Sequence, residues 1–506
     1  MIFGVNKMTK ILKVPFEEAL GMAGFGKFNC LMFILNLTVV TSMAFEVFSV
    51  SYLVPASACE LQTTVYQQGL IAGMPLLGII ASSQIWGYLA DTRGRRKILL
   101  WSLSMGFCFG FLATFSPNWI VLSLLKFLSS TALAASYPVA ITFLSESTPQ
   151  NKRSIFVSCL STQIFFASAL MAILSIPVLH VNISYYIPFL DIHFLSWRLL
   201  NIIFALPSLI GAFGIWLSYE SPRFLVRIGE DEKAIDVLKN IYFFNTGKSR
   251  DGYMVESIIL GESTGESAGE SMWSSFASQT VTLFKPPLLK STLLLSVLLV
   301  ICYFSMQPFL IWLPFISDGF MRSVEAGDTD CSLCDMLRFA GNQTTVENSD
   351  CSLNVFAMTS VFSIYFLLSV MNVIFSSSIN LIGKKRMLIT FQLVSSISAL
   401  VLNLSHHYIL NAVLFGMYTM SSINFTFLSI YVVEIYPTYV KATAVCLTLM
   451  LGRGSSALGI NILKSLLAYN CELAFYFFGG LSLFGSLLAF LLPSDKKREQ
   501  IVEDDV

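Results

Sequence analysis

Long apolar stretches, separated by short polar or charged segments, dominate the pattern of this chain. A helix that crosses a bilayer needs about 20 predominantly apolar residues, and stretches of that length lie on both sides of one long polar gap. They predict twelve membrane-spanning helices, at residues 30–54, 66–89, 98–115, 119–144, 155–177, 197–218, 291–314, 355–379, 387–405, 408–433, 440–467 and 473–492. The predicted fold class is therefore an all-α polytopic membrane protein.

The composition favours a membrane protein over a soluble one. Of the 506 residues, 55% are hydrophobic and 12% are charged, whereas about 25% of residues are charged in an ordinary soluble protein. The 31 lysines and arginines balance the 31 aspartates and glutamates, so there is no basic excess to attract nucleic acid. We expect the lipid bilayer, and not nucleic acid, to be a partner of this chain.

The positions of the basic residues predict the orientation. Lysines and arginines that flank spans stay in the cytoplasm, and with a cytoplasmic N-terminus most of them fall in cytoplasmic segments, whereas Arg322 and Arg338 fall in outside loops. An even number of spans then places the C-terminus in the cytoplasm too. Three glycosylation sequons, at Asn182, Asn342 and Asn403, fall outside under the same topology, as that modification requires.

The same topology divides the chain into five parts. The linker contains a helical stretch and a Gly/Ser/Glu-rich flexible run, so we expect it to join two bundles rather than to form a domain. The N-terminal part lacks the features of a cleaved signal peptide. The parts are a cytoplasmic N-terminus (1–29), a first six-helix bundle (30–218), a cytoplasmic linker (219–290), a second six-helix bundle (291–492) with a large outside loop (315–354), and a cytoplasmic tail (493–506).

The cysteines and short motifs give no sign of a metal site, a cofactor or catalysis. Ten cysteines are too few for a disulfide scaffold in a chain of this length, and none has metal-ligand spacing. Cys331, Cys334 and Cys351 share the large outside loop, so we expect one disulfide within 331–351, with its pairing left open. The sequence contains no Walker, H-E-x-x-H or G-x-S-x-G pattern, and we expect no enzyme activity, no metal and no cofactor.

Two pairs of motifs reveal an internal duplication. The stretches Asp91–Lys97 and Asn380–Arg386 are 289 residues apart, and Glu146–Arg153 and Glu434–Lys441 are 288 residues apart. Because six spans separate the members of each pair, both halves have the same orientation and form parallel repeats. Such repeats are typical of transporters that alternate access to a substrate held between the halves.

These motifs also carry a resemblance to a known family. The stretch Gly87–Arg96 (GYLADTRGRR) resembles the G-x-L-x-D-x-x-G-R-R signature of the major facilitator superfamily, and Tyr219–Phe224 (YESPRF) looks like the P-E-S-P-R-W motif of its sugar and organic-ion transporters. The resemblance runs from about residue 16 to the last span and implies two six-helix bundles around a central cavity. Within the superfamily the chain is similar to the synaptic vesicle glycoprotein 2 group in the stretches Phe16–Leu20, Gly24–Phe28, Phe45–Pro55 and Ser196–Arg198.

Two charges of opposite sign fall at similar depth in the predicted spans, where a charge is expensive. Glu46 and Lys126 lie about 6 Å and about 7 Å outward of the middle of their spans, at 1.5 Å per residue, so their side chains can meet. The resemblance implies that the first and fourth spans line the cavity. We therefore hypothesise a Glu46–Lys126 pair that faces substrate or proton, with a purely structural ion pair as the alternative.

A third charge, Arg453, lies between Gly452 and Gly454 near the middle of its span. Arginine does not shed its proton in proteins, so it needs an anion, and no acid in the second half lies at similar depth. Its position resembles that of an arginine in organic anion transporters, which implies a carboxylate-bearing substrate. The alternatives are a side chain that extends to polar backbone and a pair with Glu46.

The resemblance further implies a charged gate at the cytoplasmic ends of the spans. Such pairs form in the outward-open state and break in the inward-open state, and each is worth about 1 kcal/mol because it is partly solvated. Since Asn380 stands where an acid is usual, we expect the first half to hold most of the gate. The candidate gate residues are Asp91, Gly94, Arg95, Arg96, Glu146, Arg153, Glu220, Arg223, Glu434 and Lys441.

Polar and aromatic side chains at cavity depth are further candidates for contact with a substrate. Aromatic residues make up 13% of the chain, and most of them serve packing or lie at the bilayer surface. The candidates in the seventh and tenth spans are Tyr303, Gln307, Trp312, Tyr418 and Asn424.

Together these features predict a secondary transporter of a small organic solute that works by alternating access. The finer expectations are coupling to protons and an organic anion as the solute. The alternative, from a different class, is a non-transporting membrane glycoprotein that binds ligands or protein partners. We expect a location in the plasma membrane or in a vesicle membrane, and the sequence does not separate the two.

Overall fold

The computed structural model describes residues 13–181, 183–259, 280–286, 288–327, 329–343, 354–436 and 438–492. Each of the twelve predicted spans coincides with one helix or with two or three helices in direct succession. The predicted all-α fold is therefore confirmed.

The first half contributes six spans. Its fourth span is broken after Leu133 into two helices, and the other five spans are continuous. The helices are α2 (Lys27–Leu61), α3 (Val65–Arg93), α4 (Arg95–Ala113), α5 (Trp119–Leu133) with α6 (Ser136–Glu146), α7 (Gln150–Leu179) and α8 (Ser196–Leu217).

The second half repeats this pattern, with breaks in its first and fourth spans. The helices are α12 (Leu289–Ile311) with α13 (Leu313–Glu325), α15 (Val355–Ile382), α16 (Lys384–Val401) followed by η2 (Leu402–Leu404), α17 (Tyr408–Thr419) with η3 (Met420–Ile423) and α18 (Asn424–Ile435), α19 (Thr438–Tyr469) and α20 (Cys471–Ala489).

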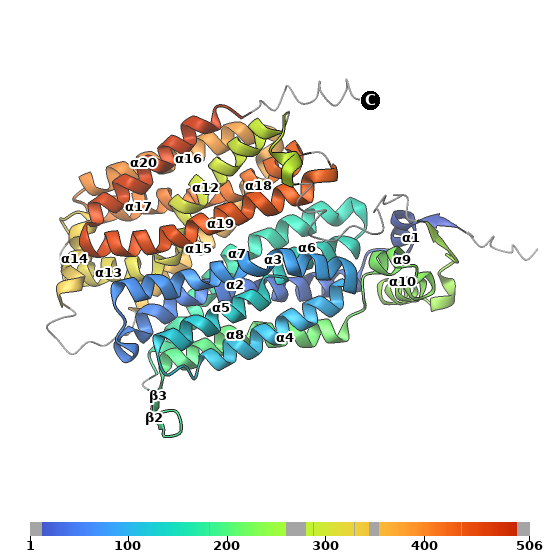
Figure 1. Cartoon of the computed structure of the whole chain (residues 1–506), viewed down its shortest axis with the longest axis horizontal. Helices are drawn as coiled ribbons and strands as arrows, with labels where there is room; N and C mark the ends of the chain where they lie inside the picture. Colours follow the sequence, from blue (N-terminus) through green and yellow to red (C-terminus); the bar gives the residue numbers. More distant parts are fainter. Residues whose placement is uncertain are drawn as a thin grey trace, which may run out of the picture.

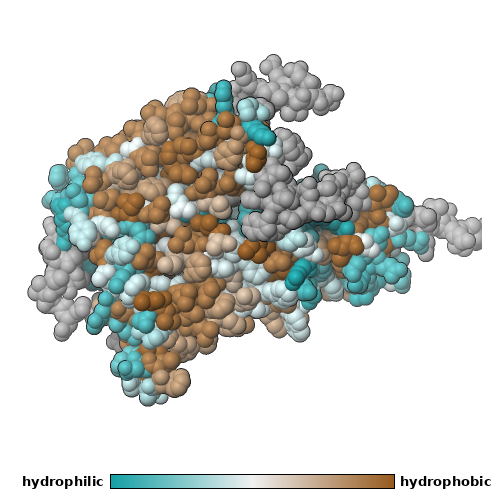
Figure 2. All heavy atoms as spheres, in the orientation of Figure 1, coloured by the Kyte–Doolittle hydropathy of each residue, from teal (hydrophilic) through white to brown (hydrophobic). Residues whose placement is uncertain are grey.

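Length and hydropathy identify most of these helices as membrane spans. Within the described residues, eleven helices are long and apolar enough to cross a bilayer, and α19, at 32 residues, is the remaining predicted span. Figure 2 shows apolar side chains over the middle of the visible face and hydrophilic side chains toward its two ends. This distribution is what a bilayer around the middle of the molecule requires.

The two halves form two bundles that lie side by side, with the second half above the first in Figure 1. We call the two ends of the molecule the basic end and the disulfide end. The basic end carries α1 (Phe16–Met22), α9 (Pro222–Arg227), α10 (Asp231–Thr246), η1 (Arg250–Gly252) and the parallel pair β1 (Val14–Pro15) and β4 (Ile258–Ile259). The disulfide end carries α13, α14 (Leu333–Gln343) and the hairpin of β2 (Ser184–Ile187) and β3 (Ile192–Leu195).

The internal duplication is visible in the backbone at two tight corners. Gly94 joins α3 to α4 with φ of +98°, and Gly383 joins α15 to α16 with φ of +92°. Only glycine adopts such angles without a steric penalty. At Gly94 a Cβ atom would also lie 2.5 Å from a carboxylate oxygen of Glu220. The repeated motif thus encodes the same corner in both halves.

Residues of the predicted linker pack on the basic end of the first bundle. The hydroxyl of Tyr253 donates to the carbonyl of Ala19 in α1 over 2.7 Å, and burial raises the pKa of that hydroxyl above its ordinary value. Asn245 at the end of α10 donates to Asn29 of α2 over 3.0 Å. Residues 231–246 are thereby attached to the first half, whereas the Gly/Ser/Glu-rich run lies outside the described residues.

The expected disulfide within residues 331–351 is wrong. Cys334 instead bonds Cys471, at a Cα–Cα distance of 5.6 Å, and Cys331 takes part in no disulfide. Cys59 is also disulfide-bonded. The prediction failed because α13 and α14 fold part of the large loop back onto the bundle, which brings Cys334 to the start of α20.

The two halves meet mainly through two pairs of helices, α3 with α19 and α7 with α15. Near the disulfide end, Gly69 of α3 packs on Asn461, and Gly73 packs on Ala457 of α19. Helices α6 and α18, which end at the basic end, make their main contacts within their own halves. In the described part of the chain, the molecule is thus closed at the disulfide end and open at the basic end.

Loss of the Cys334–Cys471 bond is expected to destabilise the second bundle. The bond closes a loop with a sequence separation of 137 residues, and native disulfides contribute about 2–4 kcal/mol. The double variant Cys334→Ser/Cys471→Ser should therefore unfold at a lower temperature in detergent, measured on purified protein. Cys108→Ser, which removes a free cysteine, is the control. Identical unfolding temperatures for the double variant and the control would contradict this expectation.

Candidate functional site

The predicted contact between Glu46 and Lys126 forms in the structure. The ammonium of Lys126 lies 3.3 Å from Glu46 Oε2 and donates to Ser49 Oγ over 3.0 Å. Both side chains are almost completely buried. Glu46 Oε2 also lies close to Gly110 of α4, where a Cβ atom would be 3.7 Å away. The pair therefore lies between α2, α4 and α5, inside the first bundle.

The carboxylate of Glu46 is only half satisfied. Its Oε1 is buried and has no hydrogen-bond partner among the described residues. A buried charge without full pairing is expensive, and an unpaired carboxylate oxygen is a place where a proton can bind. The contact between Glu46 and Lys126 is thus observed, whereas its role, in transport or in packing, stays a prediction.

A second buried ion pair, missed by the sequence analysis, provides the contrast. Arg198 is fully buried, lies 2.8 Å from Glu60 Oε1, and donates to the carbonyls of Thr114, Ser116 and His193. The other carboxylate oxygen of Glu60 accepts from the indole of Trp197 over 2.7 Å. With these bonds made, the pair has a structural role. The hydrophobic pattern does not predict this pair, because Glu60 follows the predicted first span and falls in a predicted loop.

Arg453 lies where the two halves meet. Its neighbour Gly452 packs against the ring of Tyr303, and its other neighbour Gly454 faces Ile80 of α3 in the first half. The guanidinium interacts with the hydroxyl of Tyr303, and Tyr137 of α6 lies near the same group. The Tyr303 ring stacks on Phe425, with centroids 4.5 Å apart.

Among the described residues, Arg453 has no carboxylate within ion-pair distance, and Glu46 is engaged by Lys126. The alternative of a Glu46–Arg453 pair is therefore not observed. Arg453 is thus a permanent cation beside the hydroxyl of Tyr303, on a helix that lies at the contact between the halves.

Three of the other candidates lie inside the second bundle. Tyr418 donates to the carbonyl of Ser305 over 2.9 Å, Trp312 donates to the carbonyl of Ile460 over 3.2 Å, and Asn424 donates to Gln392. All three are fully buried. Their hydrogen bonds join helices of one half, so they hold the second bundle together. Gln307 is buried to a similar degree, at 8% exposure.

Neutral polar residues that the sequence analysis did not select connect the halves. Asn372 of α15 donates to Thr162 of α7 over 3.1 Å and accepts from Thr426 of α18 over 3.1 Å. Next to Thr162, Gln163 of α7 donates to Thr41 of α2 over 2.8 Å, a contact within the first half. Hydroxyl and amide side chains are common in spans, so nothing in the sequence distinguished these residues from others of their type.

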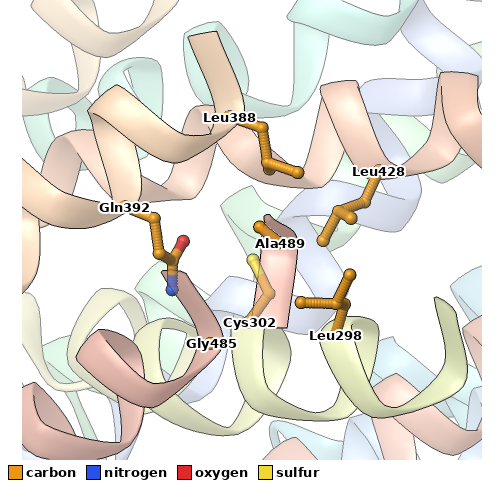
Figure 3. Close-up of a pocket in the computed structure, with 7 residues that line it drawn as sticks. All are labelled: Leu298, Cys302, Leu388, Gln392, Leu428, Gly485 and Ala489. Carbon is orange, nitrogen blue, oxygen red and sulfur yellow. The ribbon is translucent and has the colours of Figure 1, made fainter. Parts of the chain in front are cut away.

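The cavity in Figure 3 lies within the second bundle and not between the halves. It is small, with a volume of about 10 Å³. The side-chain amide of Gln392, which lines this cavity, is already hydrogen-bonded to Asn424 and to Ser482. We assign it no part in substrate binding. Its lining residues come from α12, α16, α18 and α20 and are Leu298, Cys302, Leu388, Gln392, Leu428, Gly485 and Ala489.

The first-half gate residues form one connected cluster at the basic end. Arg95 is buried and lies 3.0 Å from Glu146 and 3.2 Å from Asp91. Glu146 also accepts from the hydroxyl of Ser221. Glu220 accepts from the backbone N–H of Arg96 over 2.9 Å, at the N-terminus of α4, where a negative charge is favourable.

The partner of Arg153 is Glu17 of α1, at 2.9 Å, and not Glu146, which is taken by Arg95. Arg223 lies 3.9 Å from the same Glu17. Glu17 was missed because it precedes the first span, although its stretch contributed to the family resemblance. The side chains of Asn380, Glu434 and Lys441 lie outside the described residues, so the second-half gate stays a prediction.

The predicted glycosylation sites differ in what the structure describes. Asn182 lies outside the described residues, and Asn342 belongs to α14 with its side chain outside them. Asn403 lies in η2, and both polar atoms of its amide are buried. Glycosylation at these three positions stays a prediction.

Comparisons with known proteins point to one family and fold. The profile of the Major Facilitator Superfamily matches residues 34–327. Rat synaptic vesicle glycoprotein 2B is 29% identical over 234 residues, which are 46% of this chain and 34% of that protein. Human synaptic vesicle glycoprotein 2A is 30% identical over 245 residues, which are 47% of this chain and 32% of that protein. The match thus spans about a third of these relatives.

Solved structures with the same fold include a bacterial sugar transporter. The xylose transporter XylE from E. coli, in a partially occluded inward open conformation, superposes with a TM-score of 0.66 over 92% of this chain and 98% of that chain, at 13% identity. A structure described as a D-xylose-proton symporter gives a TM-score of 0.65 at 12% identity, over 92% and 99% of the two chains. At these identities the likeness concerns the fold alone.

The buried Arg198–Glu60 pair is expected to stabilise the first bundle strongly. Removing one partner of a buried pair costs about 3–5 kcal/mol, because the other charge is left unpaired. Arg198→Met should therefore lower the unfolding temperature of the purified protein markedly. Arg338→Met is the matched control, since its pair with Glu472 is half exposed and such pairs contribute about 0–1 kcal/mol. Equal losses in the two variants would contradict the structural role.

Proposed function

Because this chain belongs to the Major Facilitator Superfamily, we propose that it is a secondary transporter that carries a small organic anion together with protons by alternating access. The family and the fold support a multi-pass membrane protein that moves small solutes. The identity of the solute and the coupling to protons are the parts that this proposal adds.

The observation that carries the proposal is Arg453 without a protein anion. A guanidinium at membrane depth is expensive, and among the described residues no acid compensates it. The stacked pair of Tyr303 and Phe425 offers an apolar surface beside the charge. A carboxylate on an apolar body fits both features, since the guanidinium binds the carboxylate through two hydrogen bonds and the rings pack against the body.

Proton coupling rests on Glu46 and Lys126. A proton on Glu46 would remove its charge and with it the attraction that holds Lys126 at 3.3 Å. The buried, unpaired Oε1 gives the proton a place to bind. Because α2 and α5 contribute one residue each, gain or loss of the proton alters the contact between two helices of the first bundle.

The gate cluster supports the alternation of access. In the structure its contacts join elements of the first half with α1, and the basic end is open. Under the predicted topology the basic end faces the cytoplasm, so this arrangement corresponds to an inward-open state. Closure of that end would bring the second-half motif to this cluster. Opening of the disulfide end would require α3 and α19 to separate.

Removal of the Arg453 charge is expected to weaken uptake of organic anions strongly. Purified protein in liposomes is given a panel of labelled organic anions, cations, zwitterions and sugars, with and without an inward proton gradient. Arg453→Ala should lower kcat/KM for the accepted anion about 10- to 100-fold, the worth of a hydrogen bond to a charged group. Arg453→Lys should retain more activity because it keeps the charge.

The control for this experiment is Arg338→Ala, which removes an exposed arginine and should leave uptake unchanged. Accumulation of a cation or a sugar that persists in Arg453→Ala would disprove the proposal that the solute is an organic anion. Binding of solutes by the folded protein, without any accumulation, would instead favour the non-transporting alternative.

Glu46→Gln is expected to separate transport from the proton gradient. The amide keeps the shape of the carboxyl group but cannot exchange a proton, so gradient-driven accumulation should be lost. Exchange of internal for external solute does not need net proton movement and should continue. Both are measured on the same liposomes. Gradient-driven uptake at the wild-type level in Glu46→Gln would refute the assignment of Glu46 as the coupling residue.

A further inference from the structure

A second cation, Lys464, is buried and lies on the same face of α19 as Arg453, and nothing in the proposed cycle uses it. Eleven residues separate the two, so their side chains point within about 20° of each other around the helix and lie about 16 Å apart along it. Lys464 is nearer the disulfide end. Its side chain is 4% exposed.

Lys464 lies over the faces of two aromatic rings. Its ammonium lies 3.4 Å from the centroid of the Phe315 ring and 4.5 Å from that of the Trp312 ring. Among the described residues it has no carboxylate partner. Ring faces attract a cation, but they replace water less well than a carboxylate does. In the described part of the chain, each of the two cations on α19 thus has an aromatic residue beside it, Tyr303 in the case of Arg453, and no carboxylate partner.

Extension of Lys464 to the bilayer surface does not explain its position. The residue lies five positions before the end of α19 at Tyr469, a distance that a lysine side chain can bridge to reach water. The ammonium is instead held inward, over a Trp312 ring that is itself fixed by its hydrogen bond to the Ile460 carbonyl.

The face of α19 that carries Lys464 is part of the closed contact between the halves. Ala457 and Asn461, on the same side of the helix, pack on Gly73 and Gly69 of α3. Lys464 follows them toward the disulfide end. Separation of α3 from α19, which opening of that end requires, would therefore expose Lys464 and its two rings.

We propose that Lys464, Trp312 and Phe315 form an outer binding site for the carboxylate of an aromatic monocarboxylate, filled when the disulfide end opens and emptied toward Arg453. The proposal rests on the proposed function for the direction of movement. The carboxylate takes the place of the ring faces as the partner of the ammonium, and the rings pack on the apolar body. Because both sites pair one cation with aromatic rings, one ligand chemistry suits both.

The test compares the two sides of the membrane with benzoate as the probe and benzamide as its neutral match. Right-side-out and inside-out vesicles from the same cells each present one end of the protein. Lys464→Met should raise the KM for benzoate at least tenfold from the disulfide-end side and less than twofold from the basic-end side. Lys464→Arg, which keeps the charge, should stay within threefold of wild type on both sides, and benzamide should not compete with benzoate.

A purely structural role for Lys464 predicts different results. It would change the KM equally from both sides or not at all, and either result overturns the outer site. Met has a similar length without the charge, so Lys464→Met should fold, which its unfolding temperature checks. A protein that carries other anions but not benzoate refutes only the ligand class proposed here, whereas one that carries no solute refutes the proposed function.

A second readout does not depend on transport. Lys464→Cys, made in a Cys331→Ser background, should react with a charged, membrane-impermeant thiol reagent added at the disulfide end, because that end must open. Leu463→Cys, one residue earlier and fully buried in the core, is the matched control and should not react. Failure of Lys464→Cys to react overturns the outer site even if transport is found.

Discussion

The high cost of a charge inside a bilayer is the constraint on which the rest of this structure depends. The chain meets it in three ways. Arg198 and Glu60 satisfy each other and the surrounding backbone, so they act as a fixed structural element. Glu46 and Lys126 pair with one oxygen left over. Within the part of the chain that the structure describes, Arg453 lies beside the hydroxyl of Tyr303 and Lys464 lies over aromatic rings, and neither has a carboxylate partner. The roles that we propose for these groups, from structural to functional, follow this order of satisfaction.

The sequence predicted positions along the membrane normal well and positions around the helix axes poorly. Depth follows from counting residues at a fixed rise, and it correctly brought Glu46 and Lys126 to the same level. Which side of a helix faces which neighbour depends on packing that no single sequence reveals. Trp312 and Tyr418, at cavity depth, therefore turned out to bond within the second bundle.

Contacts between segments far apart in the chain were the other gap. Cys334 pairs with Cys471 because α14 returns to the bundle, and Arg153 pairs with Glu17 because α1 docks at the basic end. Cys471 and Glu17 lie outside the repeated motifs, so the duplication that predicted the two halves contained no information about these two contacts. The twelve spans, in contrast, are local features that the hydrophobic pattern predicts. The glycines of the two corners lie within the repeated motifs.

The corner at Gly94 gives α3 a mechanical property. At one end α3 is fixed to α4 by a turn that Glu220 clamps, and near the other end it rests on α19 through two glycines. A helix of 29 residues is about 43 Å long, so a tilt of about 5° around its middle displaces each end by about 2 Å in opposite directions. Because α3 connects the two ends of the molecule, a displacement of one end of this helix also displaces its other end.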